Sequence, residues 1–582
     1  MTTYHTTPLD GLVDHTTVQG VPVLHAPAPG ARTAGLLFRV GRADETLATS
    51  GITHLVEHLA LHRLGLSDAH HNGVTANTYT LFHVTGEEHE VVSYLNGVCA
   101  ALRDLPLNRL ETEKEILRTE AAGRSRGPNH HMAVWRYGAR DYGLAGLGEL
   151  GTWGLTAEQV RHWAESRFTA ENAMLWLTGD RVPDGLDLTL PAGSRIPAPV
   201  ASDALPLTPA HIRGEDGHVV FDAVLRRSTA AALFTDVLGR ALFQDLRQEG
   251  GYSYTAEADY TPRDADFATL TAYADALPQK QDAVVGAFVD TLARMRAGRI
   301  EQAELDSARG RMLKRYDTPD LGAALLPSYA LGLLLGHRIL SPEQHRKELA
   351  AVTLTDLRET AREAWDNGLL QVPTRGADWA GFAPAPQYSS HEVTGTRHAS
   401  LESDDSALVI GAEGVSRLLP GGPVTVRYDT CVAMTTRPDG ARELTGPDGF
   451  HVAVEPTLYR DVTPDRIAVL DAAVPAAAVV PLPARAPDRI PRPREREVPA
   501  PRIQEAATPP AQPPTLRDLP VWFLLLVAAE AIFGLGVLYA ALDASGPGHP
   551  ASLYLRRAIL PVAVMIALTR QVYRRWVKGG RL

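Results

Sequence analysis

Residues 51–62 read Gly-Ile-Thr-His-Leu-Val-Glu-His-Leu-Ala-Leu-His, a pattern typical of a metal-binding helix. Apolar residues flank both inner histidines, so the sequence predicts a helix whose histidines are half buried. His54 and His58 are four residues apart, which places both imidazoles on one helix face, where they can bind one metal ion. Glu57 lies near the same face and is a candidate to activate a metal-bound water. The alternative is a surface helix with two solvated histidines.

A third metal ligand is expected from a second helix. Catalytic zinc usually has three protein ligands and an open fourth position. Residues 109–124 have a strong helical pattern that carries Glu113 and Glu120 two helical turns apart on one face. Glu120 is the candidate ligand, and Glu113 is assigned a supporting role, either orienting a ligand or assisting the base. Glutamates at this spacing are also common on solvated helices.

Further sequence motifs outside these two helices also bear on the fold and function. Four segments contain them: Gly41-Arg-Ala-Asp-Glu45, Gly73-Val-Thr-Ala-Asn-Thr-Tyr-Thr80, Trp163 to Asp180, and Leu246-Arg-Gln-Glu-Gly-Gly-Tyr-Ser-Tyr254. With H-x-x-E-H, which marks the inverzincins, they resemble the pitrilysin/insulinase/mitochondrial processing peptidase group of zinc metallopeptidases. One departure is the interval between His58 and Glu120, which is shorter than in that family by about a helix. The missing piece lies between Leu66 and Asn72.

The resemblance implies peptide hydrolysis at a Zn²⁺ ion held by His54, His58 and Glu120. At such an ion the pKa of the bound water is lowered and the scissile carbonyl is polarised. Glu57 would take the proton of that water and pass it to the leaving amine, acting as general base and then as general acid.

The resemblance also implies substrate-binding residues. Asn77 and Tyr79 match a family strand whose edge an extended peptide joins. Arg247 and Tyr254 match a second-repeat pair that reaches the substrate carbonyl and the oxyanion. The alternative for this pair is a helix-end arginine and a core tyrosine. Four other histidines are interpreted as structural or surface residues: His62, His70, His71 and His83.

The expected fold class is α+β, with two tandem repeats that each hold a mixed or antiparallel sheet packed by helices. Strand-like runs at 35–40 and 173–178 bracket amphipathic helices in the first repeat, and the second repeat follows the same plan without H-x-x-E-H. The expected boundaries are a first repeat (1–195), a linker (196–206), a second repeat (207–378), a small β domain (400–478), a disordered proline-rich linker (479–517), a transmembrane hairpin (518–575) and a basic tail (576–582).

The segment expected to form the β domain has short apolar runs separated by Pro-Gly-Gly and Pro-Asp-Gly turns. Its pattern is weakly similar to bacterial PH-like domains, and an unclassified β appendage is an equal alternative. After it, prolines and charges dominate, which predicts an extended tether.

A membrane anchor is expected at the C-terminus. Residues 519–542 are almost entirely apolar and long enough to span a bilayer. Residues 558–569 form a weaker run that is either interfacial or part of a second span. Two spans would leave the basic tail and the catalytic half in the cytoplasm, as the positive-inside rule requires. Glu530, within the first span, is interpreted as a helix-packing contact.

Composition limits the class of protein. The 582-residue chain is long enough for several domains, and its net charge of −11 argues against nucleic acid as a main partner. It has two cysteines, Cys99 and Cys431, which indicates a reducing compartment. The N-terminal residues show no secretory signal, so we expect a cell-membrane protein with cytoplasmic catalytic domains.

The leading interpretation is a membrane-tethered zinc metalloendopeptidase that cuts unfolded peptides or leader segments. Family chains of this size usually supply half of a closed chamber, which implies a homodimer or a heterodimer with a related subunit. One alternative is a non-catalytic scaffold subunit of a membrane complex. Another is the catalytic half of a heterodimeric peptide-maturation protease.

Overall fold

The computed structural model describes residues 9, 11–62, 70–123, 127, 130–214, 217–373 and 376–493. These belong to one compact unit, residues 1–494, which is described here by itself. The expected membrane hairpin, basic tail and most of the proline-rich linker lie outside the described residues, as does the shortened connection after the metal-binding helix. Among the described helices none is long and apolar enough on its own to cross a membrane, and one sharply bent pair, 302–316 with 321–335, qualifies by length and composition.

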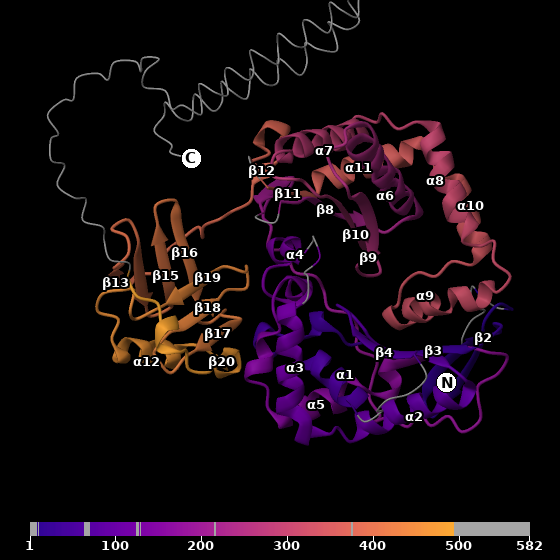
Figure 1. Ribbon diagram of the computed structural model, residues 1–582, viewed down its shortest axis with the longest axis horizontal. Helices are drawn as coiled ribbons and strands as arrows, with labels where there is room; N and C mark the ends of the chain where they lie inside the picture. Colours follow the sequence, from indigo (N-terminus) through magenta and orange to yellow (C-terminus); the bar gives the residue numbers. More distant parts are fainter. Residues whose placement is uncertain are drawn as a thin grey trace, which may run out of the picture. The chain divides into compact units, whose positions relative to one another are not determined.

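The first repeat is a six-stranded sheet with its own helices on one face, while a helix of the second repeat lies on the other face (Figure 1). Its strands lie in the order β1-β2-β6-β3-β5-β4, with β2 and β6 parallel and the remaining neighbours antiparallel. The elements are β1 Asp14–Val18, β2 Val21–Ala26, β3 Arg32–Phe38, α1 Ile52–His62, β4 His70–Thr75, β5 Thr80–Gly86, α2 Glu88–Arg103, α3 Leu110–Gly123, α4 His130–Tyr137, α5 Ala157–Arg167 and β6 Ala173–Thr178.

The second repeat follows the same plan. In its order β12-β7-β11-β8-β10-β9, strand β7 is parallel to both β12 and β11, and the remaining neighbours are antiparallel. The elements are β7 Ala210–Arg213, β8 Val219–Arg226, α6 Thr229–Leu242, the π-helical turn η7 Phe243–Glu249, β9 Ala256–Pro262, β10 Phe267–Ala274, α7 Gln281–Arg296, α8 Gln302–Lys314, α9 Leu321–Leu335, α10 Pro342–Ala351, α11 Leu354–Asp366, β11 Gly368–Val372 and β12 Ala383–Pro384. The predicted α+β class and tandem sheets are confirmed.

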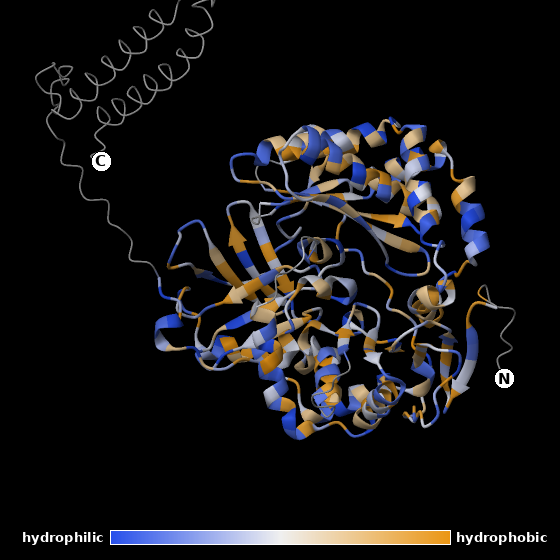
Figure 2. Cartoon of the chain, turned by 45° about the vertical axis from the view of Figure 1, so that its right-hand side comes forward, coloured by the Kyte–Doolittle hydropathy of each residue, from blue (hydrophilic) through white to orange (hydrophobic). Residues whose placement is uncertain are grey.

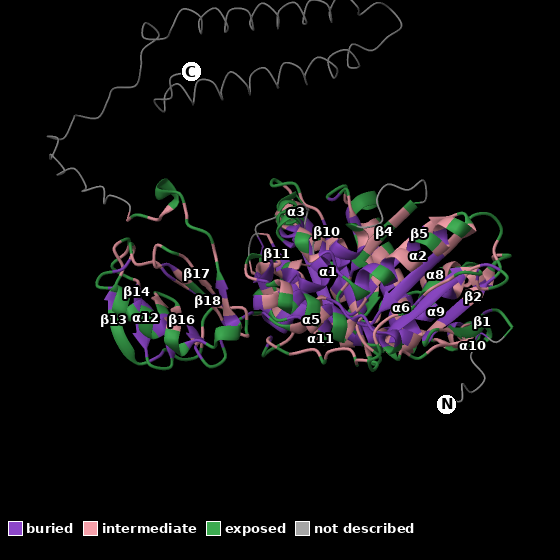
Figure 3. Cartoon of the chain, turned by 90° about the horizontal axis from the view of Figure 1, so that it is seen from below, coloured by how far each residue is buried: buried purple, intermediate pink, exposed green. Residues whose placement is uncertain are grey.

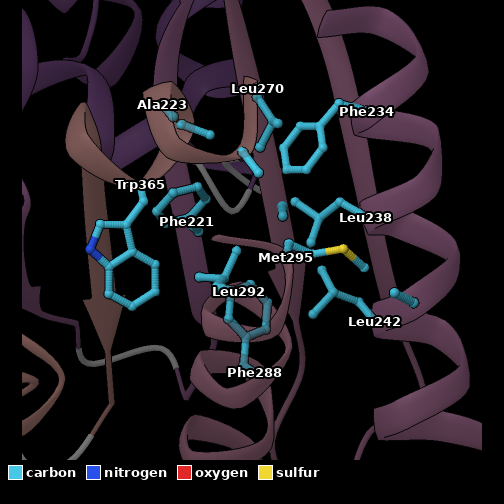
Figure 4. Packing of buried hydrophobic residues seen from close by; sticks show 14 of the residues in the cluster. Phe221, Ala223, Phe234, Leu238, Leu242, Leu270, Phe288, Leu292, Met295 and Trp365 are labelled. Atoms are coloured by element: carbon cyan, nitrogen blue, oxygen red, sulfur yellow. The ribbon is translucent and has the colours of Figure 1, made fainter. Parts of the chain in front are cut away.

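Each repeat has its own apolar core between its sheet and its outer helices. Figure 4 shows the second core, in which Phe221 and Leu270 from the sheet meet Phe234 and Leu238 of α6 and Phe288 of α7. The helices carry both hydrophobic and hydrophilic residues (Figure 2), and the buried residues concentrate in the strands and on the inner helix faces (Figure 3). This is the usual consequence of amphipathic helices that cover a sheet.

The repeats exchange one helix each. Helix α9 leaves the second repeat and packs on the first sheet, where Leu326, Tyr329 and Ala330 bury against Trp176 and Leu37. Helix α4 does the reverse, since Met132 packs with apolar residues of the second sheet. Figure 1 shows α9 lying over the strands β2 and β3. The repeats are therefore tied together by core packing as well as by the linker between them.

The β domain consists of two four-stranded sheets around a common apolar core. Its elements are β13 Gly395–Ala399, β14 Ala407–Gly411, β15 Gly414–Leu419, β16 Gly422–Arg427, β17 Ala433–Thr436, β18 Arg442–Thr445, β19 His451–Val454, α12 Pro464–Ala473 and β20 Val479–Pro481. The expected limits of 400 and 478 were too narrow. β13 begins at Gly395, and β20 pairs with β17, so residues assigned to the linker belong to a sheet.

Candidate metal centre

Helices α1 and α3 bring the three predicted ligands together. One ligand atom from each of His54, His58 and Glu120 lies within 4.8 Å of the others. Nε2 of His58 is 3.6 Å from Oε1 of Glu120, and the two imidazoles are 4.8 Å apart and perpendicular. Ligands of a tetrahedral zinc at about 2.1 Å from the metal are themselves roughly 3.4 Å apart. The two imidazoles and the carboxylate fit a zinc ion if the distances between their ligand atoms shorten slightly.

Glu113 lies against His58. Its Oε2 is 3.5 Å from Nδ1 of His58, and its Oε1 accepts a hydrogen bond of 3.2 Å from Arg109. Glu113 is buried, so its charge acts in a low-dielectric setting. This is the geometry of a carboxylate that orients a metal-binding imidazole, in line with the predicted supporting role.

Glu149 makes the matching contact with the other histidine. Its two carboxylate oxygens are 3.0 and 3.1 Å from Nδ1 of His54, and Arg42 lies 3.5 Å from Oε1. Each histidine thus has a carboxylate at Nδ1, and each carboxylate has an arginine. A carboxylate there holds the proton on Nδ1 and leaves Nε2 free for a metal.

Sequence reasoning missed Glu149. It lies between two short 3₁₀ segments, η4 Asp141–Gly146 and η5 Leu150–Trp153, that have no long helical pattern. No spacing relates it to the metal-binding helix, 95 residues earlier in the chain. Only the folded chain shows its role.

Glu57 is buried against strand β4, where it contacts Gly73 and Thr75. Its Oε2 accepts a hydrogen bond of 2.6 Å from the hydroxyl of Thr75. A Cβ atom on Gly73 would lie 2.3 Å from Oε1 of Glu57, so only glycine lets the strand approach this closely. The predicted base is therefore held by both its helix and the neighbouring strand.

The start of α1 is fixed by Glu45. Its carboxylate accepts hydrogen bonds from the backbone N–H groups of Gly51 and Thr53, at 2.8 and 2.9 Å. Burial raises the pKa of Glu45 to about 7, a shift opposed by these hydrogen bonds and reinforced by the charge of Glu149.

A cavity of about 520 Å³ adjoins the cluster. It is bounded by α3, the β4–β5 connection and the segment around Glu149, and by the β9–β10 hairpin of the second repeat. The lining side chains that carry polar groups include Arg42, Glu45, Asn77, Tyr79, Tyr137, Tyr142, Glu149, Asp222 and Arg263. Both repeats thus contribute to the space beside the proposed metal.

Asn77 and Tyr79 line this cavity, but they are not on a strand as predicted. Strand β4 ends at Thr75 and β5 begins at Thr80, so both residues lie in the connection. The edge strand on this side of the sheet is β4 itself, and β1 forms the opposite edge. Partial burial raises the pKa of the Tyr79 hydroxyl.

Arg247 and Tyr254 contact each other but do not line the cavity. The guanidinium of Arg247 lies 4.7 Å from the ring centre of Tyr254, a cation–π contact. Tyr254 is 74% exposed, which rules out the alternative of a core tyrosine. Strand β9 leads from this pair to the cavity, and seven residues span roughly 20 Å.

The other histidines lie outside the ligand cluster. His62 is largely exposed, with Nδ1 3.9 Å from Glu113. The rings of His71 and His83 contact Tyr94 and Trp176, respectively. Among the described residues, no second group of metal-binding side chains includes them.

Comparison with known proteins identifies the architecture. Residues 220–312 match the family model of the peptidase M16 inactive domain. A solved structure of a protease from Helicobacter pylori superposes with a TM-score of 0.52 at 16% identity, covering 62% of this chain and all of the other. The fold is that of the M16 peptidases. An M16 inactive domain from Pseudomonas fluorescens gives the same TM-score at 15% identity, covering 62% of this chain and 99% of the other.

Curated relatives carry zinc protease names. The chain is 24% identical over 391 residues to an uncharacterized zinc protease of Mycobacterium tuberculosis. The matched region covers 58% of this chain and 86% of the relative. A similar protein of Streptomyces coelicolor is 23% identical over 405 residues, with 61% and 87% covered. The M16 inactive-domain match falls on the second repeat, whereas the ligand cluster lies in the first.

Proposed function

We propose that this protein is a zinc-dependent endopeptidase that hydrolyses unfolded peptides or leader segments. The observation that carries the proposal is the cluster of His54, His58 and Glu120 with Glu57 buried beside it on the same helix. Relatives named as zinc proteases support it. A scaffold has no need for two imidazoles that each have an orienting carboxylate.

The chemistry follows from the side chains. A bound zinc ion supplies a water of lowered pKa and a Lewis acid for the scissile carbonyl. His54 and His58 present their Nε2 atoms because Glu149 and Glu113 hold the Nδ1 atoms. Glu57, whose carboxylate is held by the Thr75 hydroxyl, accepts the proton of the water and donates it to the leaving amine.

The edge strand offers a place for the substrate backbone. Among the described residues, β4 pairs with β5 on one side and forms an edge of the sheet on the other. An extended peptide that pairs with this free edge would pass Glu57, which contacts β4 at Gly73. Such binding reads the backbone of an unfolded chain and excludes folded proteins.

A second subunit is part of the proposal. Arg247 and Tyr254 are exposed in the described chain and do not reach the cavity beside its metal site. The family resemblance assigns this pair to substrate binding, so we infer that a second copy or a related subunit presents it. The apolar residues 519–542, outside the described part, support tethering to the cytoplasmic face of the cell membrane.

The test is zinc content and cleavage of a quenched, unstructured peptide library by the full-length protein and by Glu57→Gln. We expect about one zinc per chain in both proteins and cleavage by the parent alone. Full zinc without cleavage by the parent would indicate a missing subunit, as in a heterodimeric peptide-maturation protease. No zinc in the parent would exclude the peptidase and leave the scaffold subunit.

A further inference from the structure

The β domain is docked on the first repeat at a defined apolar contact. Side chains from both sides form one cluster, in which Ala433, Val480 and Leu482 of the β domain meet Leu144 and Leu150 of the first repeat. Strand β20 packs on η5, and β17 packs on the 3₁₀ turn η2, Leu47–Thr49. The contact is therefore made with the η4–η5 segment, residues 138–154, and with the turn that precedes α1.

The fit at one end of this segment is close. The backbone N–H of Ala139 donates a hydrogen bond of 3.1 Å to the carbonyl of Pro447 in the β domain. A Cβ atom on Gly138 would lie 2.0 Å from the same carbonyl oxygen. A glycine with φ of 76° is therefore required for docking as well as for the local backbone.

The opposite side of the η4–η5 segment contacts the start of the metal-binding helix. The hydroxyl of Ser50 bonds to the carbonyl of Gly148 at 3.3 Å and lies 3.4 Å from the backbone N of Gly151. A Cβ atom on Gly51 would lie 2.8 Å from the Cβ of Glu149. Glu149 thus extends from a layer that lies between the β domain and α1.

We propose that the β domain is a structural part of the metal centre, because it holds the η4–η5 segment in the position from which Glu149 orients His54. The inference rests on the metal site of the proposed function and adds a residue and a domain to it. Short 3₁₀ turns have few internal hydrogen bonds and depend on their neighbours for order. The coupling runs from the apolar cluster that holds Val480, Leu482 and Leu150, through Glu149 next to Leu150 in the chain, to His54.

Zinc affinity of the full-length protein tests the inference, measured by competition with a fluorescent chelator. Loss of a carboxylate that orients a ligand typically lowers metal affinity about 10–100-fold. We expect Glu149→Gln to show such a loss. Leu482→Asp, which disrupts the docking contact, should lower the affinity at least ~10-fold. The double variant should be no weaker than Glu149→Gln alone, since both changes remove the same contact.

Matched variants separate docking from folding. Leu419→Asp places the same charge at a partly buried leucine in the other sheet of the β domain and should leave zinc affinity unchanged. Gly138→Ala blocks docking from the side of the first repeat. Gly336→Ala, at a left-handed position with open space around it, controls for backbone strain. We expect weaker zinc binding from Gly138→Ala and parental binding from Gly336→Ala.

The outcomes distinguish this inference from the proposed function. A parent chain that binds no zinc would overturn both. A parent that binds zinc, with unchanged affinity in Glu149→Gln or in both docking variants, would overturn only the role of the β domain. Because the readout is metal affinity, peptide cleavage is not needed to decide.

Discussion

In the first repeat, the helix that follows β3 lies beside the edge strand β4, with Glu57 of the helix against Gly73 of the strand. In the second repeat, helix α6 follows β8 and lies beside the edge strand β9. A Cβ atom on Gly239 of this helix would lie 3.1 Å from the backbone N of Ala258 in β9. Five strands of each sheet follow the same order, β2-β6-β3-β5-β4 and β7-β11-β8-β10-β9, but the small residue has moved from the strand to the helix. α6 also contains no histidine or glutamate.

This difference shows that one scaffold supports two uses of the same helix. Where the strand residue is glycine, the helix can place a carboxylate against the strand. Where the helix is small and apolar, helix and strand close on each other and form core. The second repeat keeps the cavity wall through its β9–β10 hairpin, so it contributes shape where the first contributes ligands.

The largest expected effect is the loss of zinc affinity when a ligand of the first repeat is removed, compared with removal of a carboxylate from the second repeat. Glu120→Ala removes the third ligand on α3 and should lower zinc affinity more than ~100-fold, beyond the loss for an orienting residue. Glu304→Ala removes a carboxylate from the first turn of α8 in the second repeat and should leave zinc content unchanged. Metal analysis after dialysis measures both, and equal zinc loss in the two variants would contradict the asymmetry.

A smaller effect, on stability, is expected where the repeats exchange helices. Arg136 of α4 pairs with Asp222 of the second sheet, and both are buried. Asp222→Asn leaves the arginine charge buried without its partner and should cost about 3–5 kcal/mol of unfolding free energy.

The control for this change is Asp236→Asn on α6, whose partner Arg311 is partly exposed. Exposed pairs contribute roughly 0–1 kcal/mol. Urea unfolding measures both variants, and similar costs would show that α4 does not tie the repeats together.

Gly73→Ala tests the close approach of strand and base. The added methyl must displace Glu57, so we expect peptide cleavage to fall about 100-fold, the lower end of the range for loss of a general base. Zinc content should stay at the parental level. Gly239→Ala makes the matching change in the second repeat and should leave cleavage unchanged. A variant with parental kcat would show that the base tolerates displacement.

The smallest expected effect is a pH dependence at the end of α9. Burial, with a lesser contribution from Arg227, lowers the pKa of His337 to about 4. The unfolded chain therefore binds a proton near pH 6.5 that the folded chain binds only near pH 4, so this residue's contribution is complete above pH 6.5 and is lost as the pH falls. His337→Asn should flatten the unfolding free energy between pH 4 and 6.5. An unchanged pH profile would contradict the assignment.

The sequence predicted the parts of the site that follow helical geometry. His54, Glu57 and His58 lie within a single helix, and Glu113 and Glu120 lie on one face of another, so periodicity alone relates them. Glu149 could not be found this way, because its contact with His54 depends on a tertiary fold around short 3₁₀ turns. The prediction that Asn77 and Tyr79 lie on a strand came from the family resemblance, and it is wrong because the chain leaves β4 after Thr75 and enters β5 only at Thr80.

The arrangement of the helices was the other feature that sequence could not supply. The apolar pattern of residues 321–335 shows that α9 is buried, but a buried helix pattern does not name its partner. Helix α9 lies on the first sheet because the second face of β2, β3 and β6 must also be covered.

The helix exchange also sets an order for synthesis. The last strand of the first sheet ends at residue 178, yet the helix that covers its second face ends at residue 335. A chain emerging from the ribosome therefore completes its ligand-bearing sheet with one apolar face bare, and must wait for nearly all of the second repeat to cover it. During that interval the nascent chain is a substrate for chaperones, and a product terminated after the first repeat would aggregate through that uncovered face.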